Sequence, residues 1–194
     1  MQFSPADPTL ILYNHEWPSA DTGIRRMWLY DGKQHLRLRT EGEGRLGGDY
    51  VCHEMWERDG QAIIYHGGFK DGANFVGRVF PDGTELCEIP FPDGYVPYGH
   101  FTVGQPGVLI SDGYYCEPDD DPQNGFVCGA WIARVETNWD KATMTWIPRC
   151  KNRSSWDSQD AHPHPIINNG DTHAYFTSDF EGKRAIYRIP LYDN

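Results

Sequence analysis

Apolar residues fall in short runs along the chain, and turn residues bound most of these runs. Examples are the runs LILY at 10–13, AIIY at 62–65 and VLIS at 108–111. The runs are rich in β-branched and aromatic residues, and Asp-Gly, Pro-Gly or Asn-Gly signals separate them. This pattern predicts short antiparallel strands joined by tight turns rather than long helices. The composition agrees, with 14% aromatic residues, 21 Gly and 14 Pro.

One phrase recurs four times: a turn, a strand, a polar loop and a second strand. Its copies begin with FSPADPTLILYNHE, HEMWERDGQAIIYHGG, HFTVGQPGVLISDG and HPIINNGDTHAYFTSDFEG, and their second strands are RRMWLYDG, NFVGRVFPDG, GAWIARVE and RAIYRIPL. Repeats of this length with about four strands are typical of β-propeller blades. We therefore predict an all-β chain that forms a single partial β-propeller domain. Its four blade-like repeats lie at approximately 1–48, 49–97, 98–150 and 151–194. A β-sandwich with coincidentally similar strands is the alternative.

Histidine occupies the same place in three of these copies, six residues before a turn residue, at His53, His100 and His164. If this position opens the innermost strand of each blade, the three imidazoles converge at one end of the central channel, where propellers bind ligands. Three unrelated polar residues at strand starts are the alternative interpretation.

A second pattern, QDAHPHP, places His162 and His164 two residues apart, with Gln159 three residues upstream of His162. In an extended segment such a pair points to one side, and His100 could add a third imidazole. We predict a divalent metal ion held by His100, Gln159, His162 and His164. These neutral donors leave the charge of the ion unquenched, which favours binding of an anionic substrate. They suit Mn²⁺, and ligand type alone leaves Zn²⁺ and Fe²⁺ open.

Charge and composition narrow the function classes further. The formal net charge of -11 argues against a nucleic acid or an anionic membrane as partner, because both require a basic face. No run approaches the roughly 20 apolar residues of a membrane span, and MQFSPADP lacks the features of a secretory signal. The five cysteines contain no C-x-x-C pair, so we expect mostly buried, reduced thiols. A metal-dependent oxygenase would need a carboxylate ligand that this set lacks.

Several phrases resemble one known family. They are HEMWERDG, SSWD, Gln-x-x-His-Pro-His-Pro and FTSDFEG followed by AIY, and they are similar to the C-terminal half of oligogalacturonate lyases, polysaccharide lyase family 22. The resemblance covers essentially the whole chain. It implies part of a seven-bladed propeller and a cytoplasmic carbon–oxygen lyase. Such an enzyme cleaves digalacturonate-like oligogalacturonides from pectin by β-elimination, with manganese bound by three His and one Gln. The matching ligands are His100, Gln159, His162 and His164.

The resemblance also implies catalytic roles. His53, in the phrase CHEMW, matches the catalytic base, and Arg26, in RRMW, matches an arginine that contacts substrate. Arg25 and Arg26 would point to opposite faces of a strand, so one of them faces the channel. His15, at the end of a predicted strand, could also line the site and contact substrate. The remaining histidines are assigned structural or surface roles: His35, His66 and His173.

The chain is about half as long as members of the family. Four blades of a larger ring would expose unpaired sheet edges, so we expect self-association. The alternative function is a non-catalytic propeller fragment that acts as a binding or scaffold module. The Gln and three His donors favour the lyase, because a scaffold has no use for them.

Overall fold

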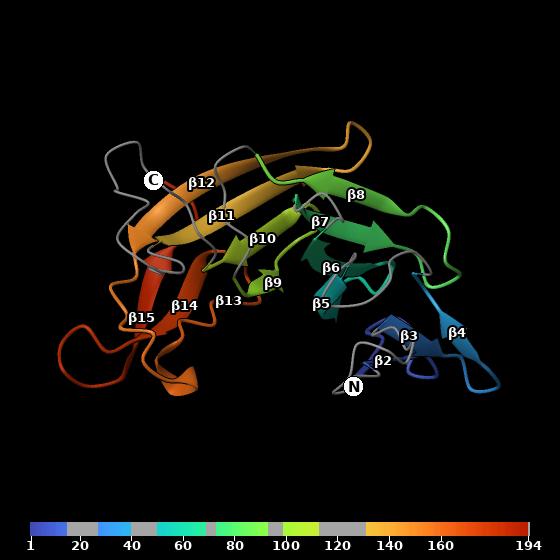
Figure 1. Ribbon diagram of the computed structural model, residues 1–194, viewed down its shortest axis with the longest axis horizontal. Helices are drawn as coiled ribbons and strands as arrows, with labels where there is room; N and C mark the ends of the chain where they lie inside the picture. The colour runs from blue at the N-terminus through green and yellow to red at the C-terminus, as the bar shows by residue number, and fades with distance from the viewer. Residues whose placement is uncertain (15–26, 40–49, 69–72, 93–98, 113–130, 194) are drawn as a thin grey trace. The chain divides into compact units, whose positions relative to one another are not determined.

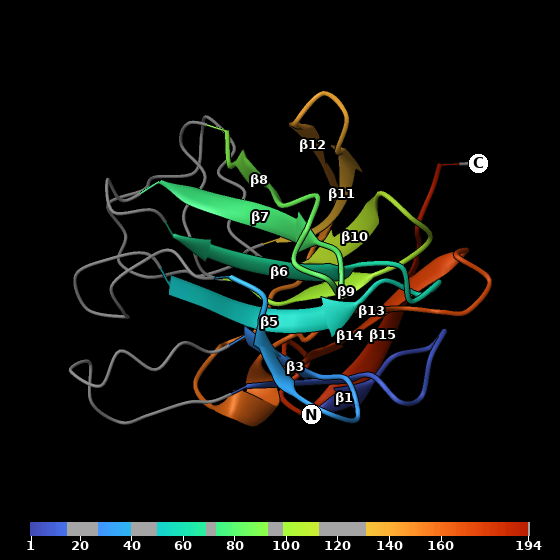
Figure 2. The ribbon, with the colours of Figure 1, turned by 90° about the vertical axis from the view of Figure 1, so that its right-hand side faces the viewer.

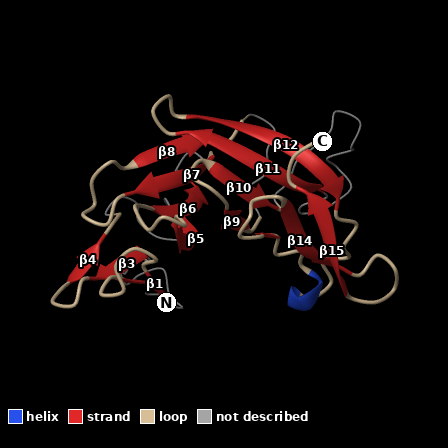
Figure 3. Ribbon diagram, turned by 180° about the vertical axis from the view of Figure 1, so that it is seen from behind, coloured by secondary structure: helices blue, strands red, loops and turns tan. Residues whose placement is uncertain are grey.

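The computed structural model describes residues 1–14, 27–39, 50–68, 73–92, 99–112 and 131–193. In this part of the chain the structure consists of antiparallel β-sheets (Figure 1). Figure 3 shows these strands in red, joined by loops, and the short 3₁₀ turn η2 (Gln159–Ala161) in blue. The expectation of an all-β fold is confirmed. None of the described residues forms a helix with the length and hydropathy that a membrane span requires.

The chain divides into two compact units, and the first contains two sheets. This unit comprises Met1–Phe91 together with Trp139–Thr143. Its first sheet is a meander of β1 (Gln2–Phe3), β2 (Ile11–Asn14), β3 (Met27–Tyr30) and β4 (His35–Arg37). The second sheet is a meander of β5 (Tyr50–Trp56), β6 (Ile63–Gly68), β7 (Asn74–Val79) and β8 (Cys87–Pro90), whose strands lie side by side in Figure 2.

The second unit comprises Pro92–Asn138 and Met144–Asn194. One sheet contains β9 (Phe101–Val103), β10 (Val108–Ser111), β11 (Trp131–Asn138) and β12 (Thr143–Lys151) in consecutive order. The other contains β13 (Ile166–Ile167), β14 (His173–Ser178) and β15 (Ala185–Pro190). Each sheet is therefore formed by strands that follow one another in the sequence. The number of blades, the closure of a ring and the four repeat boundaries stay predictions.

Each unit has its own apolar core, drawn from both of its sheets. In the first unit the core joins residues of β2 and β3 to residues of β5, β6 and β7, among them Leu12, Leu29, Ile63 and Phe75. In the second unit Val108 and Ile110 of β10 pack with Ile167, Ala174 and Phe176. Removal of these side chains from water stabilises each pair of sheets. The strands that carry the histidines are thereby fixed in place.

Candidate metal centre and histidine pair

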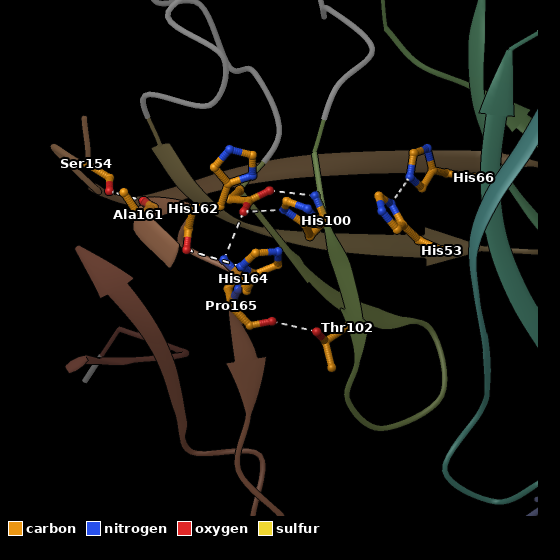
Figure 4. Close-up of polar contacts among 10 residues, drawn as sticks. His53, His66, His100, Thr102, Ser154, Ala161, His162, His164 and Pro165 are labelled. Atoms are coloured by element: carbon orange, nitrogen blue, oxygen red, sulfur yellow. Dashed lines mark hydrogen bonds and ion pairs between the residues drawn. The ribbon is translucent and has the colours of Figure 1, made fainter. Parts of the chain in front are cut away.

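Three histidines of the second unit meet at the start of its two sheets. His100 directly precedes β9, His162 ends the η2 turn, and His164 stands two residues before β13. Their potential ligand nitrogens all lie within 4.8 Å of one another. The ring centroid of His100 lies 3.9 Å from that of His164 and 5.7 Å from that of His162 (Figure 4). The structure thus brings together three of the four proposed metal ligands.

A buried carboxylate, Asp112, organises this cluster from behind. Its side chain is 0% exposed, and its Oδ2 lies 2.8 Å from Nδ1 of His100. The same carboxylate accepts hydrogen bonds from the backbone N–H of His100 at 2.5 Å and from that of His164 at 3.0 Å. With its Nδ1–H donated to Asp112, the His100 ring presents its Nε2 lone pair to the cluster. Such carboxylate–histidine pairs fix the tautomer and the orientation of the ring in metal sites.

The backbone between Gln159 and Pro165 is not a plain extended strand. The N–H of His162 closes the η2 turn on the carbonyl of Gln159 at 3.2 Å, and His164 adopts a left-handed φ of 43°. The Ser154 hydroxyl donates to the carbonyl of Ala161, and the Thr102 hydroxyl donates to that of Pro165 at 2.5 Å. The two histidines do lie close together, as predicted, but the predicted cause, side-chain alternation along an extended strand, was wrong. A turn and a left-handed residue bring them together instead.

The chemistry of these histidines fits a divalent cation. The pKa of His162 lies below its usual value because of desolvation, helped by the neighbouring His100 and His164. Desolvation and His100 likewise lower the pKa of His164. Both rings are therefore held in the neutral form that a metal ion requires. In addition, His162 Nδ1 is buried and has no hydrogen-bond partner among the described residues, and such an atom is costly unless a ligand satisfies it.

The fourth proposed ligand, Gln159, lies in η2 and is exposed. Its position one 3₁₀ turn before His162 matches the proposal, which stays a prediction for its side chain. Trp156 belongs to the phrase SSWD but received no role in the sequence analysis, yet its ring lies 4.6 Å from that of His162 and stacks at 6.4 Å on that of His100. Asp112 was also missed, because LISDG reads as a strand followed by a turn. The sequence carries no signal that this carboxylate faces a histidine.

His53 belongs to a second cluster, in the first unit, with Cys52 and His66. Nδ1 of His53 forms a hydrogen bond with Nε2 of His66 (Figure 4), and Cys52 Sγ lies 3.2 Å from the same Nε2. His66 is 3% exposed, whereas Cys52 and His53 are half-buried. Sequence reasoning gave His66 only a structural or surface role and so missed this contact. Half-burial of Cys52 also departs from the expected buried thiols.

A β-bulge explains how adjacent residues of one strand reach the same partner. The pairing of β5 with β6 shifts register between Cys52 and Met55, and His53 has a φ of 53°. Side chains of neighbouring residues normally point to opposite faces of a strand, and a bulge removes that constraint. Non-glycine residues rarely adopt a left-handed φ, which is often found at functional positions. The bulge thus turns His53 towards His66 of the neighbouring strand.

Two sequence-predicted residues, His15 and Arg26, lie outside the described residues. The four proposed ligands belong to the second unit and His53 to the first. Among the described cysteines, Cys52, Cys87 and Cys150 form no disulfide bond.

Together, antiparallel sheets and an imidazole cluster backed by a carboxylate define an all-β protein with a candidate metal centre. Comparison with known proteins gives the family. The chain belongs to the oligogalacturonate lyase family, whose model matches residues 2–194, and the resemblance inferred from the sequence is confirmed. It is 26% identical over 209 residues to oligogalacturonate lyase of Dickeya dadantii (strain 3937). This alignment covers 99% of this chain and 49% of the Dickeya protein. It is also 26% identical over 208 residues to oligogalacturonide lyase of Pectobacterium atrosepticum, with 99% and 49% covered.

Solved structures agree with this assignment. An oligogalacturonate lyase of Vibrio parahaemolyticus matches with a TM-score of 0.77 and 26% identity, over 98% of this chain and 48% of that one. An oligogalacturonate lyase in complex with manganese matches in fold with a TM-score of 0.71 and 23% identity, over 98% and 47%. The chain spans about half the length of the relatives it matches.

Proposed function

We propose that this chain carries the metal centre and the catalytic base of an oligogalacturonate lyase. Its substrates are short, digalacturonate-like oligogalacturonides, and its products carry a 4,5-unsaturated sugar. The proposed ion is Mn²⁺, with other divalent ions as alternatives, and its ligands are His100, Gln159, His162 and His164. One observation carries the proposal: in a member of this family, three imidazoles converge around a buried carboxylate.

The proposed reaction is a β-elimination across C4 and C5 of a uronate residue. When bound, a divalent ion supplies positive charge that stabilises the negative charge developing on the uronate carboxylate. His53 accepts the C5 proton at Nε2, while its Nδ1–H is donated to His66. The C4–O bond then breaks as the C4=C5 double bond forms, and the glycosidic oxygen leaves as a hydroxyl group after it takes up a proton from solvent. His53 returns the C5 proton to solvent before the next turnover. Arg26 and His15 are proposed to contact the substrate, with Arg26 pairing with a carboxylate.

Asp112 affects the net charge of the proposed metal centre. The four donors are neutral, but a carboxylate lies behind His100 and reduces the net charge around a bound cation. In return it makes His100 a stronger donor and holds the backbone N–H of His164. An anionic substrate then approaches a site whose positive charge remains local, within a chain of net charge -11.

The experiment is an elimination assay with digalacturonate and Mn²⁺, which follows ultraviolet absorbance of the unsaturated product. Loss of a general base typically lowers the rate on the order of 10²–10⁴-fold, so His53→Ala should lose turnover to that extent. His35→Ala is the matched control, since His35 is an exposed histidine of the same unit that contacts Tyr13. The same substitutions are made at the equivalent positions of a full-length relative.

Turnover that survives His53→Ala in both proteins would refute the assignment of the base, and His15 would be the next candidate. A chain that binds Mn²⁺ but shows no elimination, beside an active full-length relative, would instead be the non-catalytic binding module considered above.

We propose that the four sheets are blades of a partial propeller, that the protein acts in the cytoplasm, and that it self-associates. The edge strand β15 supports self-association, because Ile186 on it is 77% exposed. Sedimentation of the chain should therefore reveal dimers or larger species. A monodisperse monomer would contradict this part of the proposal.

A further inference from the structure

The cluster of Cys52, His53 and His66 contains more chemistry than the elimination needs. The proposed reaction uses His53 and, through a hydrogen bond, His66, but it assigns nothing to the thiol of Cys52. Yet this thiol and two imidazole nitrogens lie within 4.8 Å of one another. Such a set offers one soft donor and two borderline donors from two adjacent strands. The proposed manganese centre, by contrast, contains no sulfur donor.

We propose that Cys52, His53 and His66 form a second cation site, which takes a soft or borderline metal ion such as Zn²⁺. The ligand atoms are Cys52 Sγ, His53 Nδ1 and His66 Nε2, and a fourth position is left for water. Three protein ligands with one open position are a common arrangement for zinc. The site lies entirely within the first unit, on the bulge of β5 and the facing residue of β6.

The spacing of the donors suits tetrahedral zinc. With Zn–N of about 2.0–2.1 Å and Zn–S of about 2.3 Å, neighbouring donors lie about 3.3–3.6 Å apart. Cys52 Sγ is already 3.2 Å from His66 Nε2. The two imidazole nitrogens are at hydrogen-bond distance and must separate as the ion takes the place of the shared proton. His53 is half-buried on the bulge and can make this movement, whereas His66 is buried and fixed.

The two clusters should therefore sort metal ions by softness. Thiolate favours Zn²⁺ and disfavours Mn²⁺, whereas amide oxygen and imidazole accept Mn²⁺. Binding at the second cluster requires the thiolate, so the thiol of Cys52 releases its proton to solvent. No oxidation or further reactant is involved.

A metal ion at this site would also prevent His53 from acting as the catalytic base. This consequence rests on the proposed function. In the metal-free pair, His53 donates its Nδ1–H to His66 and keeps a lone pair on Nε2 for the substrate proton. A cation on Nδ1 leaves the single proton of the neutral ring on Nε2, which can then accept nothing. Zinc would thus inhibit elimination by fixing the wrong tautomer, without displacing manganese.

Cobalt(II) is the probe of choice, because it substitutes for zinc and reports a sulfur ligand by a thiolate-to-cobalt charge-transfer band in the near ultraviolet. The wild-type chain should develop this band on titration with Co²⁺, and one equivalent of Zn²⁺ should remove it. Cys52→Ser should abolish the band. The matched controls Cys87→Ser and Cys150→Ser, which replace the other two described thiols, should leave it unchanged.

The variant His162→Ala/His164→Ala separates this proposal from the previous one. It should keep the charge-transfer band even though it lacks two of the four proposed manganese ligands. If the double variant also retains manganese, the proposed function fails while the second site stands. A band that persists in Cys52→Ser, or that never forms although cobalt binds, overturns the second site.

A measurement on the unaltered protein guards against misfolding of the variants. Zn²⁺ should slow alkylation of Cys52 by iodoacetamide at least tenfold, as read by mass spectrometry of the peptide that contains it. Mn²⁺ at the same concentration should have no effect on this rate. Equal alkylation rates with and without Zn²⁺ would also overturn the proposal.

Discussion

The two histidine clusters of this chain use the same side chain for different purposes. In the second unit, His100, His162 and His164 stand in loops beside a buried carboxylate that accepts hydrogen bonds from two of them. In the first unit, His53 sits within a strand, bonded to another imidazole with a thiol nearby. The cluster of His100, His162 and His164 can direct several nitrogen lone pairs to one point. The pair of His53 and His66 instead holds one ring against the other and leaves Nε2 of His53 to accept a proton.

A shared position in a sequence repeat therefore does not determine the role of a histidine. His53, His100 and His164 all stand six residues before a turn residue. His100 directly precedes strand β9, whereas His53 lies inside strand β5, at a bulge, and has a left-handed φ. The partner of each ring decides which nitrogen is available: the Asp112 carboxylate for His100, the His66 imidazole for His53 and the backbone carbonyl of His162 for His164. Substitutions at each cluster can test whether that distinction is real.

Removal of two imidazoles should abolish manganese binding. We expect His162→Ala/His164→Ala to retain no Mn²⁺ after gel filtration, because a single remaining imidazole with Gln159 makes a weak site. Metal analysis by mass spectrometry measures the content. His173→Ala, which changes a histidine of β14 in the same unit, should bind Mn²⁺ normally. Undiminished manganese in the double variant would refute the ligand assignment.

Asp112→Asn should weaken manganese binding by about 10–100-fold, the usual cost of losing a carboxylate behind a metal-bound histidine. An amide N–H opposite His100 Nδ1 would favour the tautomer that protonates Nε2. Titration of Mn²⁺ measures the affinity, and the histidine tautomer is visible in ¹⁵N NMR spectra.

Asp179→Asn is the matched control for this change. Its carboxylate accepts hydrogen bonds from Ser155 in the same region but from no histidine in the described contacts. We expect little change in its affinity for Mn²⁺. Equal losses in both variants would show that the carboxylates act only by holding the loop.

Thr102→Val should have a smaller effect. It removes the hydrogen bond to the carbonyl of Pro165, which typically contributes about 0.5–1.5 kcal/mol. We expect a lower denaturation midpoint and a loss of manganese affinity of less than about tenfold. Thr145→Val, an exposed position on β12, should leave both unchanged. A Thr102→Val chain as stable as the wild type would mean that this hydrogen bond does not anchor the segment.

Acid should destabilise the metal-free protein slightly, through His162 and His164. Their pKa values in the folded state lie below the ordinary value of 6.5. As the pH falls through 6.5, the unfolded chain therefore binds more protons than the folded chain, and stability decreases until the folded-state pKa is passed. Melting temperatures in the presence of a chelator measure the slope. His162→Gln/His164→Gln should flatten it, and an unchanged slope would contradict the shifts.

Much of this picture could be predicted from the sequence, for physical reasons. Short apolar runs between turn signals define antiparallel strands, because side-chain alternation and turn chemistry are local properties. The grouping of His100 with His162 and His164 followed from the repeat and the His-x-His spacing. The roles of Asp112 and His66 could not be foreseen, since each depends on strand pairing between distant residues. The bulge at His53 is likewise a tertiary feature that no local signal announces.

His100 is proposed to bind the manganese ion, whereas His53 is proposed to act as the base and to take no part in manganese binding. Parallel Mn²⁺ titrations of His53→Ala and His100→Ala, followed by the loss of the electron paramagnetic resonance signal of free Mn²⁺, test this division of roles directly. We predict that His53→Ala binds one equivalent with wild-type affinity and that His100→Ala binds none at the same concentrations. Loss of binding in His53→Ala, or its retention in His100→Ala, would contradict the account.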